Sequence, residues 1–178
     1  MSGGDEAESV PASGQQSELA QIIRSDDPFS LQRMRIKAMD YLARREHGCD
    51  ELKGKLIKKE CPPSIAAEVV AQLAAENLVS DERFTENFIN SKRNRGQGPV
   101  RIRQELREKG IIDDLIDAWL DPREPRWLDI LKEVRSKKFG SILPRGYKER
   151  ARQARFLQYR GFTTDQIFRV LGDDDELD

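Results

Sequence analysis

Five cationic side chains surround a turn near the middle of this chain. They are Lys92, Arg93, Arg95, Arg101 and Arg103, on either side of Gly96-Gln97-Gly98-Pro99. Guanidinium and ammonium groups grouped in this way contact phosphate or carboxylate oxygens, so the chemistry open to this stretch is binding of a polyanion or an acidic protein surface. The Gly-x-Gly pattern does not indicate a phosphate loop, because no strand precedes it and no Gly-Lys-Ser/Thr ending follows.

Further basic residues recur at predicted helix ends on both sides of this stretch. A solvated helix face is the alternative explanation for any one of them, but their recurrence at corresponding positions favours a contact surface. Binding to phosphate and binding to an acidic protein both weaken with salt, so salt dependence alone does not separate the two partners. The candidate contact residues are Arg44, Arg45, Lys92, Arg93, Arg95, Arg101, Arg103, Lys109, Lys137, Lys138, Arg145, Arg152, Arg155 and Arg160.

Catalytic and metal chemistry find little support in the sequence. The single histidine, His47, lies near Cys49 and Cys61, but the spacing of the three matches no common zinc pattern. A surface histidine beside a helix end and two free thiols are the favoured interpretation. Glu105 and Glu108 sit among arginines and indicate ion pairs within a helix rather than an acid/base couple. We therefore expect no enzyme activity, no metal and no cofactor.

The composition indicates a helical chain with much exposed surface. Of its 178 residues, 35% are charged and 37% are hydrophobic, and the net charge of −1 conceals acidic ends around a basic middle. We expect residues 1–29 to be a disordered acidic extension and residues 173–178 an acidic tail. Two cysteines, no long apolar run and no signal peptide pattern predict a cytoplasmic protein without disulfides or membrane spans.

Helical periodicity and helix breakers predict the elements that position these side chains. No stretch alternates as a strand would, so the predicted class is all-α. One helix begins near Ser30 and is expected to end at Gly48, and Trp119 and Trp127 are predicted to be core residues rather than stacking platforms. The other predicted helices cover residues 50–60, 65–78, 81–95, 99–109, 113–121, 126–138, 147–160 and 164–171.

A repeat of about 50 residues organises these helices. Leu52, Leu56 and Val70 correspond to Ile102, Leu106 and Leu120, and Val69 corresponds to Trp119. A similar shift places Leu106, Gly110 and Ile116 on Leu157, Gly161 and Ile167. Such a period predicts three tandem three-helix repeats in an elongated, curved array, with repeats at 30–79, 80–122 and 123–172. The alternative is that amphipathic helices of similar length align by chance.

The middle repeat carries a resemblance to a known family. The residues concerned are Asp81-Glu82-Arg83-Phe84, the stretch from Lys92 to Gly98-Pro99, and Ile102 through Lys109-Gly110-Ile111. Ala38, Tyr41-Leu42, Glu51-Leu52 and Arg160-Gly161-Phe162 support it in the outer repeats. Over residues 34–171 the chain resembles the RecX family of bacterial recombinase regulators. One departure is Glu60, which stands where the other repeats have glycine, so we expect Pro62-Pro63 to make that break.

The resemblance implies a function. RecX proteins are built from tandem three-helix repeats, lie in the groove of the RecA recombinase filament on DNA and suppress its activity. We therefore expect a monomeric, non-enzymatic regulator whose partner is a RecA-type filament, with weak, non-sequence-specific DNA contact. The alternative is a helical module that binds DNA directly, because three-helix units can place a helix in a groove.

Overall fold

The computed structural model describes residues 28–172, and this part of the chain folds into nine α-helices without a strand. The predicted acidic tail and all but the last two residues of the predicted extension lie outside the described residues. The helices are α2 (Leu31–Leu42), α3 (Cys49–Ile57), α4 (Pro63–Ala75), α5 (Asp81–Asn94), α6 (Pro99–Glu108), α7 (Asp113–Trp119), α8 (Arg126–Phe139), α9 (Tyr147–Tyr159) and α10 (Thr164–Leu171).

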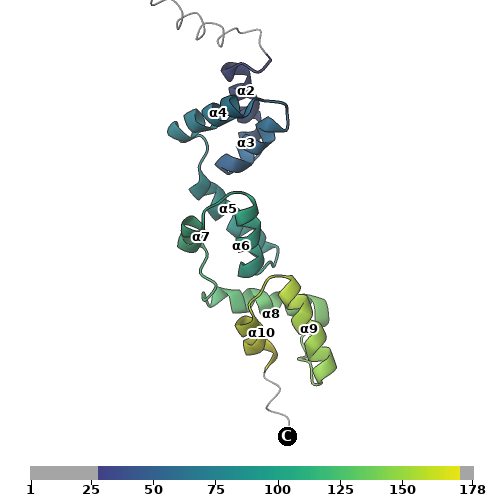
Figure 1. Cartoon of the computed structure of the whole chain (residues 1–178). Coiled ribbons are helices and arrows are strands. Elements are labelled where there is room, and N and C mark those ends of the chain that lie inside the picture. The colour runs from purple at the N-terminus through teal and green to yellow at the C-terminus, as the bar shows by residue number, and fades with distance from the viewer. Residues whose placement is uncertain (1–27, 173–178) are drawn as a thin grey trace, which may run out of the picture.

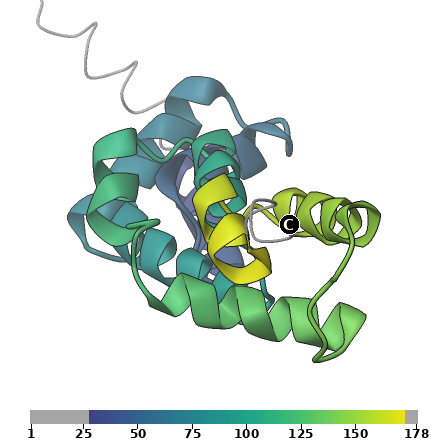
Figure 2. The same ribbon diagram turned by 90° about the horizontal axis from the view of Figure 1, so that it is seen from below.

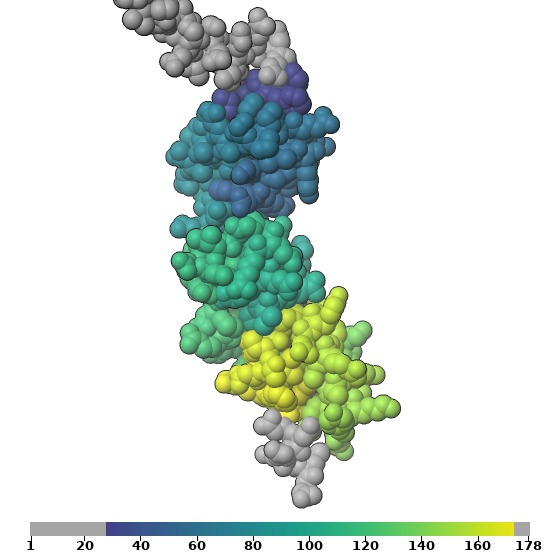
Figure 3. Space-filling view, viewed as in Figure 1, coloured from purple at the N-terminus to yellow at the C-terminus, as the bar shows by residue number. Residues whose placement is uncertain are grey.

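The helices form three bundles of three. Domain 1 contains α2 to α4, domain 2 contains α5 to α7, and domain 3 contains α8 to α10 (Figure 1). Figure 3 shows the three domains as successive lobes of an elongated, slightly bowed column. The predicted all-α class with tandem helical repeats is confirmed.

Helix starts follow from local side-chain chemistry. Ser30 and Ser80 precede α2 and α5, and each hydroxyl accepts a hydrogen bond from the backbone N–H three residues later. Thr163 and Gln166 form a capping box at α10. Proline begins α4 and α6, where its missing N–H costs no helix hydrogen bond.

The buried apolar residues of the described chain form two hydrophobic cores. The first lies inside domain 1 and contains Leu52, Leu56, Val69 and Leu73, all fully buried. The second is continuous through domains 2 and 3, from Phe84 in α5 to the C-terminal helix α10. Domains 2 and 3 therefore share apolar packing that domain 1 does not join.

Two expectations, about the end of one helix and about one turn, are wrong. Helix α2 ends at Leu42 rather than at Gly48, and Gly48 is instead the residue before α3. Glu60 adopts a left-handed backbone with φ of 65°, the conformation that Gly110 and Gly161 adopt in domains 2 and 3. The repeat thus keeps the left-handed turn despite the glutamate, and Pro62-Pro63 begins the next helix rather than replacing the turn.

Trp119 does not belong to the core as predicted. Its side chain is 41% exposed, whereas its counterpart Val69 is fully buried. The two helices differ in length: α7 ends at Trp119, whereas α4 continues past Val69 to Ala75. Trp127, in contrast, is fully buried and donates its indole N–H to the Asp121 carbonyl oxygen at 2.8 Å.

Candidate interaction surface

The glycine-proline turn before α6 is the joint between domains 2 and 3. The backbone N–H of Gly98 donates to the Arg160 carbonyl oxygen at 2.8 Å, and that of Val100 donates to the Gly161 carbonyl oxygen at 2.9 Å. A side chain on Gly98 would overlap the Gly161 carbonyl group. The turn that the sequence associates with binding therefore holds the two domains against each other and fixes where the cations around it lie.

Arg93 is buried beneath this joint. Only 8% of its side chain is exposed, its guanidinium lies 4.5 Å from the centre of the Trp127 ring, and one Nη is 3.3 Å from Glu124. Burial lowers the pKa of Arg93. Its contacts identify it as a link between domains 2 and 3 rather than as a freely exposed contact residue.

A cleft of about 750 Å³ opens between the end of α5, one face of α8 and the end of α9. Arg95, Arg126 and Lys138 line it, and each of the three forms no ion pair with any residue between 28 and 172. Asp129 and Glu133 are its acidic lining residues, and Glu133 already binds Lys137 at 2.5 Å. The cleft therefore has an excess of positive charge available to an anionic ligand.

Five of the predicted residues meet in this cleft: Arg93, Arg95, Lys137, Lys138 and Arg160. Arg160 donates to the Arg95 carbonyl oxygen at 3.2 Å and stacks over Phe156 at 5.4 Å. Arg126 also lines the cleft, although it is not among the predicted contact residues. Its helical spacing to Ile130, Val134 and Lys137 was the available signal, because residues at these intervals share one face of a helix.

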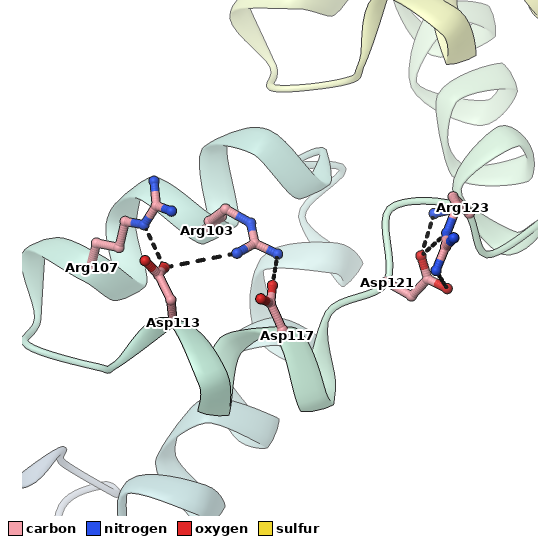
Figure 4. Close-up of polar contacts among 6 residues, drawn as sticks. All are labelled: Arg103, Arg107, Asp113, Asp117, Asp121 and Arg123. Atoms are coloured by element: carbon pink, nitrogen blue, oxygen red, sulfur yellow. Dashed lines mark hydrogen bonds and ion pairs between the residues drawn. The ribbon is translucent and has the colours of Figure 1, made fainter.

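Lys92, Arg101 and Arg103 are engaged within domain 2. Lys92 and Arg101 both bind Glu105, Arg101 at 2.9 Å. Burial alone would raise the pKa of Glu105, but hydrogen bonds from these two cations outweigh it and the pKa is lowered. Arg103 of α6 points at Asp117 of α7 (Figure 4), so its charge is largely balanced inside the domain.

Arg45 and Lys109 lie at the other joint, between domains 1 and 2. Both bind Glu51 of α3 at 2.8 Å, and only 14% of the Glu51 side chain is exposed. Burial favours a raised pKa for Glu51, but the hydrogen bonds from Arg45 and Lys109 prevail and lower it to about 2. This carboxylate thus ties a domain 2 cation to domain 1.

The remaining candidates are dispersed. Arg44 is exposed after α2, and Arg145 is exposed before α9. Arg152 binds Glu149 at 3.0 Å, and Arg155 donates to the Ala151 carbonyl oxygen at 3.4 Å. The structure thus gathers only part of the predicted set at one place.

The histidine and the cysteines do not converge. His47 is 2% exposed, not a surface residue as expected, because it packs beside Tyr41 with Nδ1 2.9 Å from the Arg45 carbonyl oxygen. Burial lowers its pKa. Cys61 lies in the domain 1 core, while Cys49 begins α3. Among residues 28–172 no group of three potential ligands could hold a metal ion, and no helix is long and apolar enough to cross a bilayer.

These features define a class: an all-helical tandem-repeat protein with a cationic cleft at the joint of its second and third domains. Residues 35–73, 80–120 and 124–171 match, in order, the first, second and third three-helix domains of RecX. The chain belongs to the RecX family.

Individual relatives agree with this assignment. The regulatory protein RecX of Halorhodospira halophila is 44% identical over 145 residues, which cover 82% of this chain and 90% of that protein. Regulatory protein RecX of Pseudomonas syringae pv. tomato is 40% identical over 84% of this chain and 97% of its own length. The crystal structure of RecX from Lactobacillus salivarius has a TM-score of 0.67 at 18% identity over 79% of this chain and 94% of that one, a likeness of fold.

Proposed function

We propose that this chain binds a RecA-type recombinase filament on DNA and lowers its ATP hydrolysis and strand exchange. The observation that carries the proposal is the cationic cleft between domains 2 and 3, where Arg95, Arg126 and Lys138 remain without acidic partners in the described chain. Membership of a family whose members are named regulatory proteins supports the same conclusion.

The shape of the molecule suits a periodic partner. An elongated column of three domains can contact several neighbouring subunits of a filament at once, and each added contact raises the effective concentration of the next. Inhibition then requires that the column bind one state of the filament more tightly than the active state, because a ligand shifts an equilibrium only through its differential affinity. The anionic groups that enter the cleft are carboxylates of the recombinase or phosphates of the DNA.

Charge reversal in the cleft tests this proposal. The variant R95E/K138E should inhibit recombinase ATPase and strand exchange at least tenfold less well per mole than the wild type, while keeping its melting temperature. The matched control is K59E/K132E, which makes the same change in charge at exposed positions outside the cleft; Lys132 even lies on the same helix as Lys138. Equal inhibition by both variants would contradict the role of the cleft, and no effect of saturating wild-type protein on the recombinase would contradict the function.

The second candidate is direct DNA binding without a recombinase. The same cleft favours it, since three unpaired cations could bind backbone phosphates. A titration of labelled DNA with the protein alone separates the two. Tight, sequence-selective binding supports the DNA-binding module, whereas weak and non-selective binding supports the filament regulator.

The protein acts without catalysing a reaction, as a monomer in the cytoplasm. Sedimentation of the purified protein tests the monomer, and the absence of ATP hydrolysis by the protein alone tests the non-enzymatic role.

A further inference from the structure

The connection between α8 and α9 presents large apolar side chains to solvent. Ile142 is 76% exposed, Leu143 is 52% exposed, and Tyr147 at the start of α9 is 75% exposed. Figure 2 shows this connection at the outer edge of domain 3. We call residues 140–147 the apolar loop.

A buried arginine anchors the backbone of the apolar loop. Arg135, only 5% exposed, donates Nη2 to the Gly140 carbonyl oxygen at 3.1 Å and to that of Ile142, while its Nε donates to Gln153 at 3.0 Å. Pro144, in the middle of the loop, is buried. A buried guanidinium therefore fixes the backbone at both carbonyls while the adjacent side chains remain outside, so their exposure does not result from a lack of anchoring.

The segment from Val134 to Lys148, which contains the apolar loop, has basic residues but no aspartate or glutamate. The flanking Glu133 and Glu149 bind Lys137 and Arg152. Arg145 and Lys148 are exposed, and neither forms an ion pair with another residue of the described range. A surface that matches this one must offer a pocket for aliphatic side chains inside a rim of carboxylates.

A protein fits this description better than a nucleic acid. An apolar centre within a charged rim is the usual anatomy of a protein–protein contact. Nucleic acid offers phosphates, but accepting Ile142 or Leu143 would require unstacking of bases, which costs a few kcal/mol per step. Single strands bind instead by stacking on aromatic rings, and Tyr147 is the only aromatic residue of the loop.

We propose that the apolar loop is a docking point for the protein component of the filament, inserting Ile142 and Leu143 into an apolar pocket rimmed by acidic residues on a recombinase subunit. This inference rests on the proposed function and adds a second contact to it, separate from the cleft between domains 2 and 3.

The test compares I142S/L143S with I36S/I112S. The control removes two apolar side chains of similar exposure, 59% and 67%, from domains 1 and 2. Affinity is measured by fluorescence for recombinase filaments on oligothymidylate and for oligothymidylate alone. The loop variant should bind filaments about tenfold more weakly than wild type, a loss of about 1.4 kcal/mol, while the control stays within about twofold. Neither variant should change affinity for the oligonucleotide alone, and both should melt as wild type does.

A second variant tests the acidic rim. R145E/K148E should bind filaments more weakly than K59E/K132E, and its affinity should depend less steeply on salt because fewer ion contacts form. It also tests the docking proposal independently of the loop's apolar residues.

Each contrary outcome has a distinct meaning. If I142S/L143S binds filaments as tightly as wild type, the loop proposal is wrong and the proposed function stands. If it loses affinity equally for the bare oligonucleotide, the loop contacts nucleic acid and the docking proposal is again wrong. If R145E/K148E binds filaments as tightly as K59E/K132E does, the recombinase has no acidic rim around the pocket, and that part of the proposal is wrong. If wild-type protein fails to bind filaments at all, the proposed function and the loop proposal fall together.

Discussion

Gly98 and Gly161 pack backbone against backbone across the joint of domains 2 and 3. No side chain separates them, and the N–H of the residue two positions after Gly98 donates to the Gly161 carbonyl oxygen at 2.9 Å. Gly110, which corresponds to Gly161 in the repeat, lies at the joint of domains 1 and 2 and packs closely against the Asp50 side chain. The repeat in the sequence is thus also a repeat in how one domain meets the next.

Gly98→Ala should destabilise the protein by about 1–3 kcal/mol, because the new methyl group overlaps the Gly161 carbonyl and must separate the domains. Backbone strain is not the cause, since Gly98 has an ordinary φ of −86°. Thermal unfolding measures the loss. The control is Gly54→Ala inside α3, where nothing lies within 4 Å of the added carbon. Gly54→Ala should stabilise the helix by about 0.5–1 kcal/mol. A Gly98→Ala protein that melts at the same temperature as wild type would disprove the close contact between Gly98 and Gly161.

Glu51→Gln should lower stability by about 2 kcal/mol near neutral pH, since the three hydrogen bonds that Arg45 and Lys109 donate to this side chain lose the carboxylate charge. The pKa of Glu51 falls from 4.5 to about 2 in the folded protein, so the unfolded chain binds more protons between these values. The stabilisation is complete above about pH 5 and disappears as the pH falls toward 2.

Melting temperatures of wild type and Glu51→Gln, measured from pH 7 to 3, check this dependence. The difference in melting temperature between wild type and Glu51→Gln should become smaller as the pH falls. Glu76→Gln is the control, because Glu76 pairs with Arg35 within domain 1 at an exposed site and should matter by less than about 1 kcal/mol. A difference between wild type and Glu51→Gln that stays constant with pH would show that the carboxylate charge is not what stabilises the joint.

Arg93→Met should lower stability by about 2 kcal/mol, because it removes the cation from the buried Trp127 ring and leaves Glu124 without this partner. Arg95→Met, two residues away and exposed, should leave stability within about 0.5 kcal/mol. Denaturant unfolding followed by Trp127 fluorescence in a Trp119→Phe background measures both. Equal stability of the two variants would contradict a structural role for Arg93.

The two cores predict two separable unfolding units. Leu56→Ala in the first core and Leu157→Ala in the second should each cost about 2–5 kcal/mol, since both side chains are fully buried. Amide hydrogen exchange should show faster opening of domain 1 alone for Leu56→Ala, and of domains 2 and 3 together for Leu157→Ala. Uniform acceleration along the whole chain in either variant would mean that the column unfolds as a single unit.

The helices and their order could be predicted from local residue patterns alone. Proline, glycine and serine or threonine act within one or two helical turns, so Ser30, Ser80 and Pro99 mark helix starts without knowledge of the rest of the fold. The repeat could also be recognised in the sequence, because each bundle buries equivalent helix faces and so keeps the same spacing between its apolar residues. Trp119 shows the limit: its position in the repeat indicates burial, but exposure depends on whether a neighbouring helix covers it.

Which cations are available to a partner depends on the packing of the whole chain. Arg93, Arg95 and Arg103 are alike in sequence, yet one lies under Trp127, one is exposed beside the cleft and one is bound to Asp117. Their partners are distant in the chain or on another helix, and a charge is free or neutralised according to which side chains the packing brings within hydrogen-bonding distance. Composition and periodicity carry no information about those distances, and that is why the basic residues were visible in the sequence while the cleft was not.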